Sequence, residues 1–110
     1  MENQERTLQM YVRKDGKVPY QDWFLSLKDK SAAAIILKRL DLLAHGGFGK
    51  HRVLSGGLVE LKINHGPGYR VYIGLAGPVF VILLCGGDKR SQSQDVETAK
   101  EYWNNYRVRD

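Results

Sequence analysis

The chain opens with a pattern of alternating hydrophobic and polar positions. The alternation covers residues 7–13, where Leu8, Met10 and Val12 share one side. A two-residue repeat is typical of a strand with one buried face, because successive side chains point to opposite faces. The turn residues Lys14–Lys17 follow, so we expect the strand to end there.

A helical repeat of apolar residues replaces the alternation after this turn. Pro19 suits the first position of a short helix over residues 20–27, and Ser31 suits the N-cap of a second helix that runs to about His45. Gly46 follows, where a glycine often ends a helix. The apolar positions of the two predicted helices are Trp23, Phe24 and Leu27, and Ala32, Ile35, Ile36, Leu40 and Leu43.

The second half of the chain predicts three strands and a last helix. Leu58–Ile63, Tyr69–Leu75 and Val79–Cys85 are strand-like runs separated by turns that contain glycine and proline. Such short connections favour antiparallel hairpins, because a parallel crossover needs a dozen residues or more. The helical repeat returns from Ser93, with Trp103 among its apolar positions.

These elements predict a single domain over residues 1–110 with the order β-α-α-β-β-β-α. The expected fold class is α+β, a small antiparallel sheet with the helices packed on one face. A length of 110 residues and a hydrophobic fraction of 43% suit one globular core and argue against a disordered chain. The first eleven residues lack an apolar signal core and no apolar run has the length of a membrane helix, so we expect a cytoplasmic protein with no membrane partner.

The hairpin between the first two strands of the second half has one favoured register. Its five-residue turn, 64–68, places Lys62 opposite Arg70 and Glu60 opposite Tyr72. One face of the hairpin is then apolar and packs on the helices, while the other carries these four polar residues. Directly opposed Lys and Arg repel each other, so Glu60 or a bound anion has to relieve the repulsion. The polar face is either an ordinary solvated surface or a phosphate-binding surface.

Basic residues concentrate in the segment that contains this hairpin. The chain has a net charge of +5, and residues 46–90 contribute +4 of it, with six basic against two acidic residues. This excess favours an anionic partner, and a concave sheet face with Arg, Lys and Tyr suits a nucleic-acid backbone. The further residues expected to bind nucleic acid around this face are Lys50, His51, Arg52 and Arg90.

Few residues offer metal or nucleophile chemistry. No Cys/His cluster has the spacing of zinc ligands, and the single Cys85 ends a buried strand, so we expect neither a metal nor another cofactor. His51 and His65 lie in loop sequence near the basic segment, where an imidazole can act as acid or base, although surface histidines usually have no such role. The glycine-rich segment 86–92 lacks the spacing of a nucleotide-binding P-loop, which leaves Lys89 at the rim of a strand end.

Several blocks along almost the whole chain, from about Tyr11 to Tyr102, resemble one toxin family. Val59–Ile63, Gly66–Tyr72 and Ile82–Lys89 together resemble the phage-derived, HigB-like addiction module killer branch of the RelE/ParE toxin superfamily. The resemblance implies a RelE-like fold and the toxin of a type II toxin–antitoxin pair. It also implies a helix-turn-helix antitoxin as the partner, encoded by an adjacent gene.

Toxins similar to RelE cut mRNA without metal, usually on the ribosome, whereas those similar to ParE poison DNA gyrase. For the first activity the resemblance implies that Arg70 clamps phosphate, since it matches the strand arginine of the family. Lys62 stands where the branch more often has arginine, and Lys89 matches the basic residue after the last strand. No tyrosine follows this last loop, so the general base and acid stay open. The candidates for them are Lys62, Tyr72, His65 and His51.

Three hypotheses therefore stay open. The first, favoured by the Arg and Lys set on the sheet, is a metal-independent, ribosome-dependent mRNA endonuclease that inhibits translation. The second is a gyrase poison that binds protein and cuts no RNA. The third is a catalytically inactive relative that binds an antitoxin. A basic site of this kind also predicts a partner whose acidic or helical segment lies over it.

Overall fold

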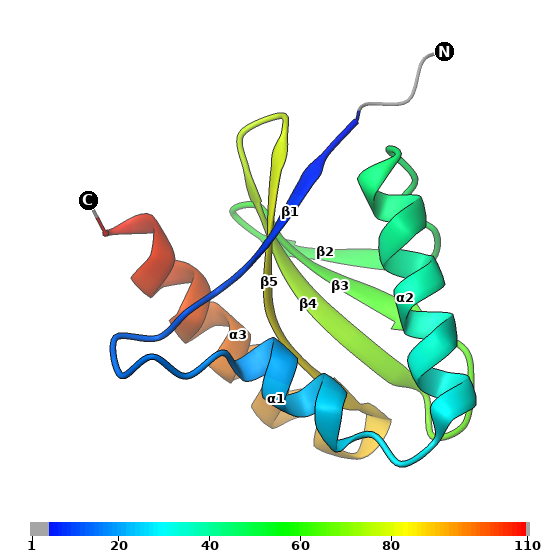
Figure 1. Cartoon of the computed structure of the whole chain (residues 1–110). Helices are drawn as coiled ribbons and strands as arrows, with labels where there is room; N and C mark the ends of the chain where they lie inside the picture. The colour runs from blue at the N-terminus through cyan, green and yellow to red at the C-terminus, as the bar shows by residue number, and fades with distance from the viewer. Residues whose placement is uncertain (1–4, 110) are drawn as a thin grey trace.

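The computed structural model describes residues 5–109 and shows an α+β protein with three helices and a five-stranded sheet (Figure 1). The strands are β1 (Thr7–Met10), β2 (His51–Ser55), β3 (Leu58–Ile63), β4 (Tyr69–Ala76) and β5 (Phe80–Asp88). The helices are α1 (Pro19–Ser26), α2 (Lys30–Ala44) and α3 (Gln92–Arg107), with a 3₁₀ turn, Lys89–Ser91, before α3. Residues 1–4, part of the segment expected to lack a signal core, and residue 110 lie outside the described residues.

The sheet is mixed rather than antiparallel throughout. Its strand order is β1-β5-β4-β3-β2, and β1 pairs with β5 in parallel, whereas the other three pairings are antiparallel. The prediction of an antiparallel sheet is therefore wrong at this edge. Most of the chain separates β1 from β5, so no hairpin dictates the direction in which they pair.

Strand β2 is an element that the hydrophobic pattern did not predict. It forms the edge of the sheet opposite β1, and its side chains are mostly exposed, with Val53 66% exposed. A strand without a buried face shows no alternation of apolar and polar residues that could reveal it. Four strands rather than three therefore follow α2.

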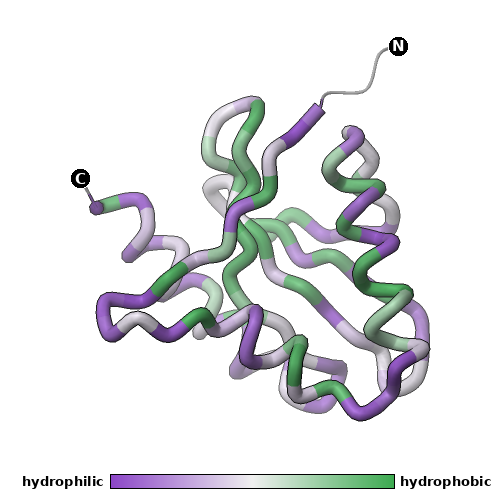
Figure 2. Tube along the Cα trace, in the orientation of Figure 1, coloured by the Kyte–Doolittle hydropathy of each residue, from purple (hydrophilic) through white to green (hydrophobic). Residues whose placement is uncertain are grey.

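Helices cover both faces of the sheet, which corrects the expectation that they pack on one face (Figure 1). One face packs against α1 and α2, and the core between them includes Ile36 of α2, Val59 of β3 and Val71 of β4. The other face packs against α3, where Tyr72 and Trp103 are buried. Neighbouring residues of one strand thus belong to different cores, as the alternation of side chains requires. Figure 2 shows the hydrophobic stretches along the strands at the centre of the molecule.

The structure confirms one of the two predicted helix starts. α1 begins at Pro19, as predicted. α2 begins at Lys30 because Asp29, and not Ser31, is its N-cap. The Asp29 Oδ1 atom accepts hydrogen bonds from the amides of Ser31 and Ala32 at 2.9 and 3.2 Å. Aspartate and serine cap helices equally well, so the pattern alone could not choose between them.

The first strand is shorter than its alternation predicts and ends at Met10. Leu8 packs against the core, but Met10 and Val12 are exposed. Tyr11 is buried instead, and its ring stacks on Tyr102 of α3 with the ring centroids 5.0 Å apart. Packing against α3, rather than the alternation, decides which side chain is buried here.

The predicted register of the β3–β4 hairpin is confirmed, and the neighbouring strands extend it into two rows of side chains on the α3 face. One row lies beneath α3, and we call it the closed row. The other lies beyond the N-terminus of α3, and we call it the open row. The closed row consists of Arg52, Glu60, Tyr72 and Cys85, and the open row of Lys62 and Arg70.

Candidate functional site

A small cavity of about 220 Å³ lies at the open row. Among the described residues, its lining contains four basic side chains and no acidic one. The basic side chains come from four separate segments, so tertiary structure brings them together. We call this hollow the cationic cavity; its lining residues are Lys50, Lys62, Ile63, Asn64, Gly68, Arg70 and Lys89.

The ends of neighbouring strands position the four cations. Lys62 of β3 and Arg70 of β4 lie directly opposite each other. Lys50 immediately precedes β2, and its carbonyl oxygen accepts a hydrogen bond of 2.9 Å from the Lys62 amide. Lys89 follows β5 at the start of the 3₁₀ turn. The structure therefore places four cations singled out from the sequence around one cavity, namely Lys50, Lys62, Arg70 and Lys89.

Arg70 is the cation of this cavity with the most restrained side chain. Its side chain is only 13% exposed. Its Nη1 atom donates a hydrogen bond of 3.1 Å to the carbonyl oxygen of Gly68, and its Nε atom lies 3.7 Å from Oε2 of Glu60. Within residues 5–109 the Nη2 atom makes no hydrogen bond. A guanidinium held on two sides with one nitrogen uncommitted is suited to bind an anion oxygen.

Glu60 is a buried carboxylate that the sequence indicated only as a possible counter-charge. Its side chain is 0% exposed. The Tyr72 hydroxyl and the Gln92 side-chain amide both donate hydrogen bonds to its Oε2 atom, at 3.1 and 3.0 Å. The Nε atom of Arg52 lies 3.2 Å from its other oxygen, Oε1. With Arg70 near Oε2, the carboxylate has one guanidinium beside each oxygen.

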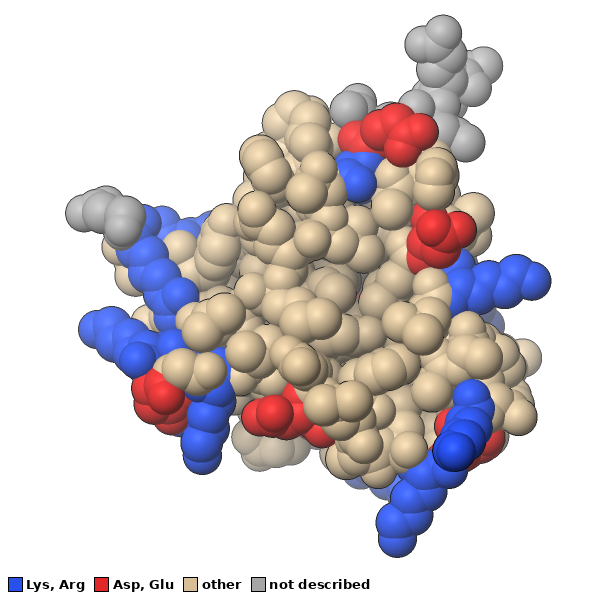
Figure 3. All heavy atoms as spheres, viewed as in Figure 1, with Lys and Arg blue, Asp and Glu red and all other residues tan. Residues whose placement is uncertain are grey.

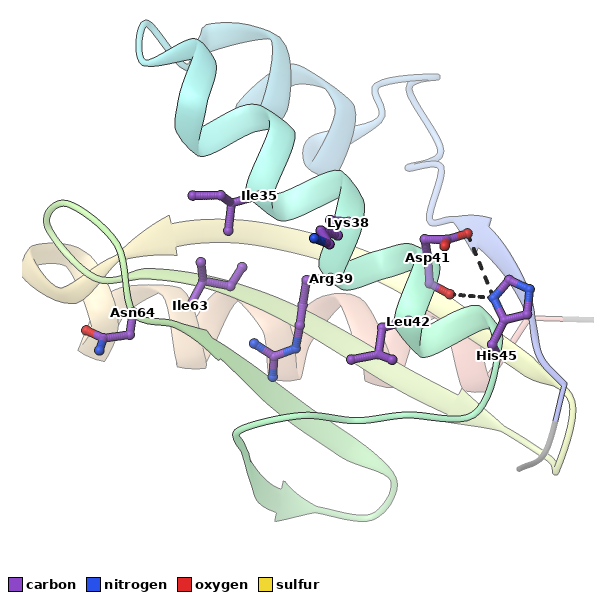
Figure 4. A pocket seen from close by; sticks show the side chains of 8 residues that line it. All are labelled: Ile35, Lys38, Arg39, Asp41, Leu42, His45, Ile63 and Asn64. Atoms are coloured by element: carbon purple, nitrogen blue, oxygen red, sulfur yellow. Dashed lines mark hydrogen bonds and ion pairs between the residues drawn. The ribbon is translucent and has the colours of Figure 1, made fainter. Parts of the chain in front are cut away.

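Arg39 is a functional candidate that sequence reasoning missed. Its guanidinium extends from α2 toward the strands and donates hydrogen bonds to the carbonyl oxygens of Phe48, Lys50 and Lys62 (Figure 4). Burial lowers the pKa of Arg39 from its ordinary value. Gly49 permits this approach, because a Cβ atom there would lie 2.5 Å from the Arg39 Nε atom. Arg39 thus ties together the backbone that carries two of the four cations, and the only signal in the sequence is a basic residue beside apolar helix positions.

Tyr72 does not line the cationic cavity. It is fully buried in the closed row, and burial together with the neighbouring Glu60 raises the pKa of its hydroxyl far above the ordinary value. The expectation that Tyr72 acts directly on RNA as acid or base is therefore corrected, since no part of its side chain is accessible. Arg52, from the same row, is 48% exposed but lines a separate hollow next to Gln92 and Ser93.

Neither of the two histidine candidates lines the cationic cavity. His51 belongs to β2 rather than to a loop, and its ring packs on Phe48 with the centroids 5.0 Å apart. Its partner across the sheet, Leu61, is buried in the core beneath α2, so His51 is on the face opposite the cavity. His65 lies in the β3–β4 turn, where its Nε2 atom is 3.2 Å from Oδ2 of Asp29.

Arg90, the remaining candidate, forms an ion pair at the surface. Its Nη2 atom lies 2.8 Å from Oδ2 of Asp88, and its side chain is 81% exposed. The hydrogen bond from Arg90 lowers the pKa of Asp88 from its ordinary value. Asp88 also caps the 3₁₀ turn by accepting a hydrogen bond of 2.8 Å from the Arg90 amide. Asp88 therefore has a structural role, and its ion pair is with Arg90 and not with Lys89.

A larger and mostly apolar groove of about 550 Å³ adjoins the cationic cavity (Figure 4). The groove runs beside α2, with Ile35 and Leu42 on its helical side, and shares Ile63 and Asn64 with the cavity. Figure 3 shows a broad area without charged residues on the side of the molecule seen in Figure 1, with Lys and Arg toward its borders. An apolar groove and a cationic cavity therefore meet at the end of β3.

The described residues give no sign of a metal site or of a membrane span. Within residues 5–109, no three His, Cys, Asp or Glu side chains are grouped so that they could hold a metal ion. Over the same residues, no helix is both long enough and apolar enough to cross a membrane.

The comparisons with known proteins identify one family relationship. A protein of Haemophilus influenzae, named only as an uncharacterized protein, is 43% identical to this chain over 91 residues. The similarity spans 83% of this chain and 92% of the relative. The chain therefore belongs to the same family as this Haemophilus influenzae protein. No family model matches the chain.

Proposed function

We propose that this protein is the toxin of a type II toxin–antitoxin system with a RelE-like fold, and that it is a metal-independent, ribosome-dependent mRNA endonuclease. The observation that carries the proposal is the cationic cavity, where Lys50, Lys62, Arg70 and Lys89 surround about 220 Å³ without an acidic residue in the lining that the structure describes. Four cations around one cavity, of which only Arg70 has an internal carboxylate beside it among the described residues, suit a phosphodiester whose negative charge grows during reaction.

The proposed reaction uses the RNA's own 2′-hydroxyl as nucleophile. Its proton leaves to a base, the 2′-oxygen bonds to the adjacent phosphorus, and the bond from phosphorus to the 5′-oxygen breaks. The departing 5′-oxygen takes a proton from an acid, so the products are a 2′,3′-cyclic phosphate and a 5′-hydroxyl end. Arg70 stabilises the extra negative charge on the phosphoryl oxygens through its uncommitted Nη2 atom.

Proton transfer in this scheme is assigned to Lys62 and Lys89. Tyr72 is inaccessible, and His51 and His65 do not line the cavity, so Lys62 remains of the four candidates, and Lys89 joins it because it lines the same cavity. A lysine ammonium can give a proton to the leaving oxygen, and a neutral lysine amine can accept one. The ribosome supplies the orientation of the message, which can replace a strong base in lowering the barrier.

The proposed partner is a small helix-turn-helix antitoxin encoded by an adjacent gene. Carboxylates of such a partner would neutralise the cations of the cavity, and an apolar helix face would pack into the groove that adjoins it. The toxin would act in the cytoplasm, where its ribosomal substrate is found.

Mapping of mRNA ends after induction tests this function. We expect expression of the wild type without antitoxin to arrest growth and to produce new 5′ ends at fixed positions within codons, detected by primer extension. Arg70→Ala should remove both effects, whereas Arg13→Ala, which replaces an exposed arginine outside the cavity, should retain them. Intact mRNA together with an induced DNA-damage response would instead indicate a gyrase poison, and harmless expression of the wild type would indicate an inactive antitoxin-binding relative.

A further inference from the structure

We propose that Glu60 is a positioning residue, which holds the Arg70 guanidinium in the orientation that the cleavage step requires. The inference rests on the proposed function, because it concerns the same cavity. It is carried by the contacts that the buried carboxylate makes at the border between the closed and open rows.

The burial of Glu60 requires an explanation. A carboxylate with no exposed surface loses the solvation that water would provide, and an apolar side chain of similar size often stabilises such a position more. Strand β3 places Leu58 on the same face, where it is buried against α3. An apolar residue could therefore fill the position of Glu60. The reason for a carboxylate there has to lie in the residues that it contacts.

The partners of Glu60 fix the oxygen that faces Arg70. Tyr72 and Gln92 both donate their hydrogen bonds to Oε2, and Oε2 is the atom that lies 3.7 Å from the Arg70 Nε atom. Two donors on one oxygen restrict the rotation of the carboxylate, and they reach it from β4 and from the first residue of α3. The negative charge beside Arg70 is thus held in place by the sheet and by the helix together.

Arg70 depends on this charge for its orientation. Its Nε atom is buried and makes no hydrogen bond in the described structure, so attraction to Glu60 across 3.7 Å is what compensates its burial. Together with the hydrogen bond from Nη1 to Gly68, this attraction sets the plane of the guanidinium. The same charge offsets the repulsion between Arg70 and the directly opposed Lys62.

The substitution Glu60→Gln separates positioning from folding and from binding. The amide oxygen of glutamine can still accept the hydrogen bonds from Tyr72 and Gln92, but the negative charge is lost. The site then carries one more net positive charge, so its affinity for RNA should not fall. The control Leu84→Val removes a methylene group from a fully buried side chain on the same face, without any contact to Arg70.

Single-turnover cleavage of programmed ribosomes, with the protein in excess, measures both quantities. For Glu60→Gln we expect the maximal rate to fall at least about tenfold while the half-saturating concentration changes less than about threefold. Leu84→Val should lower the melting temperature and keep the maximal rate of the folded protein. A Glu60→Gln protein with the wild-type maximal rate, or with a rate loss explained by its unfolded fraction, would overturn the positioning role and leave the proposed function intact.

A spectroscopic measurement tests the positioning role independently of cleavage. The ¹⁵N–¹H signal of the Arg70 Nε group, assigned by its disappearance in Arg70→Lys, should be shifted and slow to exchange with water in the wild type. Glu60→Gln should move this signal toward the position of exposed arginines, and Leu84→Val should leave it in place. If the wild type cleaves no RNA but shows this response, the proposed function is wrong, although Glu60 still sets the orientation of the Arg70 guanidinium. An unchanged Arg70 signal in Glu60→Gln overturns the positioning role.

Discussion

The closed row and the open row are neighbours on the same face of the sheet, yet they present their charges differently. In the closed row Glu60 is completely buried, and every polar contact it makes is with the protein itself. In the open row Lys62 and Arg70 line a cavity, and an Arg70 nitrogen is uncommitted in the described structure. The two rows differ by one two-residue step along β3 and β4.

The position at which α3 begins accounts for this difference. Its first residue, Gln92, hydrogen-bonds to Glu60, so the helix covers the closed row from its first turn. The 3₁₀ turn before α3 carries Lys89 to the cavity instead of covering it. A charged side chain that lies beneath α3 is therefore buried and bonded within the protein, whereas one that lies beyond the first residue of α3 can contact a ligand.

The substitution Arg70→Ala is expected to have the largest effect, because it removes the held guanidinium of the open row. Loss of a preorganised donor to a developing oxyanion costs about 10²–10³ in rate. We expect a loss of this size in cleavage of programmed ribosomes, with an unchanged circular dichroism spectrum. Cleavage at the wild-type rate by a folded Arg70→Ala protein would remove the functional distinction between the rows.

The substitution Gly74→Ala tests how rigidly α3 covers its side of the sheet. A Cβ atom at residue 74 would lie 2.2 Å from the Trp103 ring, which is buried and whose Nε1 atom donates a hydrogen bond of 2.8 Å to Gly56. Such overpacking should lower the free energy of unfolding by about 1–3 kcal/mol, measured in urea. Gly86→Ala should cost less, because it meets Trp23, which is only partly buried and can shift. Equal stability of Gly74→Ala and the wild type would mean that α3 is loosely held.

Two substitutions at Lys62 distinguish the contribution of its charge from its proposed role in proton transfer. Lys62→Ala should reduce cleavage about tenfold and lower the slope of log affinity against log salt by about one, as for the loss of one phosphate contact. Lys62→Arg keeps the charge and should retain the wild-type salt dependence, but it should lower cleavage, because a guanidinium does not exchange its proton as the proposed proton transfer requires. Lys100→Ala, which removes an exposed lysine paired with Glu97 on α3, is the matched control and should leave both quantities unchanged. A Lys62→Ala protein that behaves like this control would exclude Lys62 from the RNA contact.

The smallest effect is expected at the end of β5, for Asp88→Asn. Its hydrogen bond from Arg90 lowers the pKa of Asp88 below the ordinary 3.8, so the ionised form stabilises the folded state. This stabilisation is present above the ordinary pKa and disappears as the pH falls through the folded-state pKa. Asparagine still caps the turn, so we expect a loss of less than about 1 kcal/mol at pH 7 that vanishes in acid, measured by urea unfolding across this range. A loss that does not change with pH would assign the effect to the cap alone.

Local patterns in the sequence predicted the elements with a buried face. The alternation and the five-residue turn led to the correct pairing of Lys62 with Arg70, because a slip by one residue would bury the charged side chains. Strand β2 was not predicted because four of its five side chains are exposed, so it has no alternation of buried and exposed residues. The parallel pairing of β1 with β5 was not predicted, because the two strands are distant in the chain and no short turn joins them.

The candidate site was predictable in part for the same reason. Lys62, Arg70 and Lys89 follow from strand alternation, from the turn length and from the end of the last strand, and the structure gathers them at one cavity. The contribution of Arg39 could not be predicted, since its three carbonyl partners depend on how α2 packs. The prediction that Tyr72 is accessible was wrong, because the alternation shows which face of the sheet a residue is on but not that α3 covers that face.

The sequence by itself determined the three helices, the strands other than β2, the register of the central hairpin and the opposition of two cations on it, because these depend on side-chain periods and on one short turn. Only the tertiary structure decided that α3 lies on the polar face, that Glu60 is buried there, and that Lys50 and Lys89 join Lys62 and Arg70 around one cavity. The physical reason is that burial on a sheet face depends on contacts between residues such as Glu60 and Gln92, 32 positions apart. No local repeat of hydrophobic residues records such a contact.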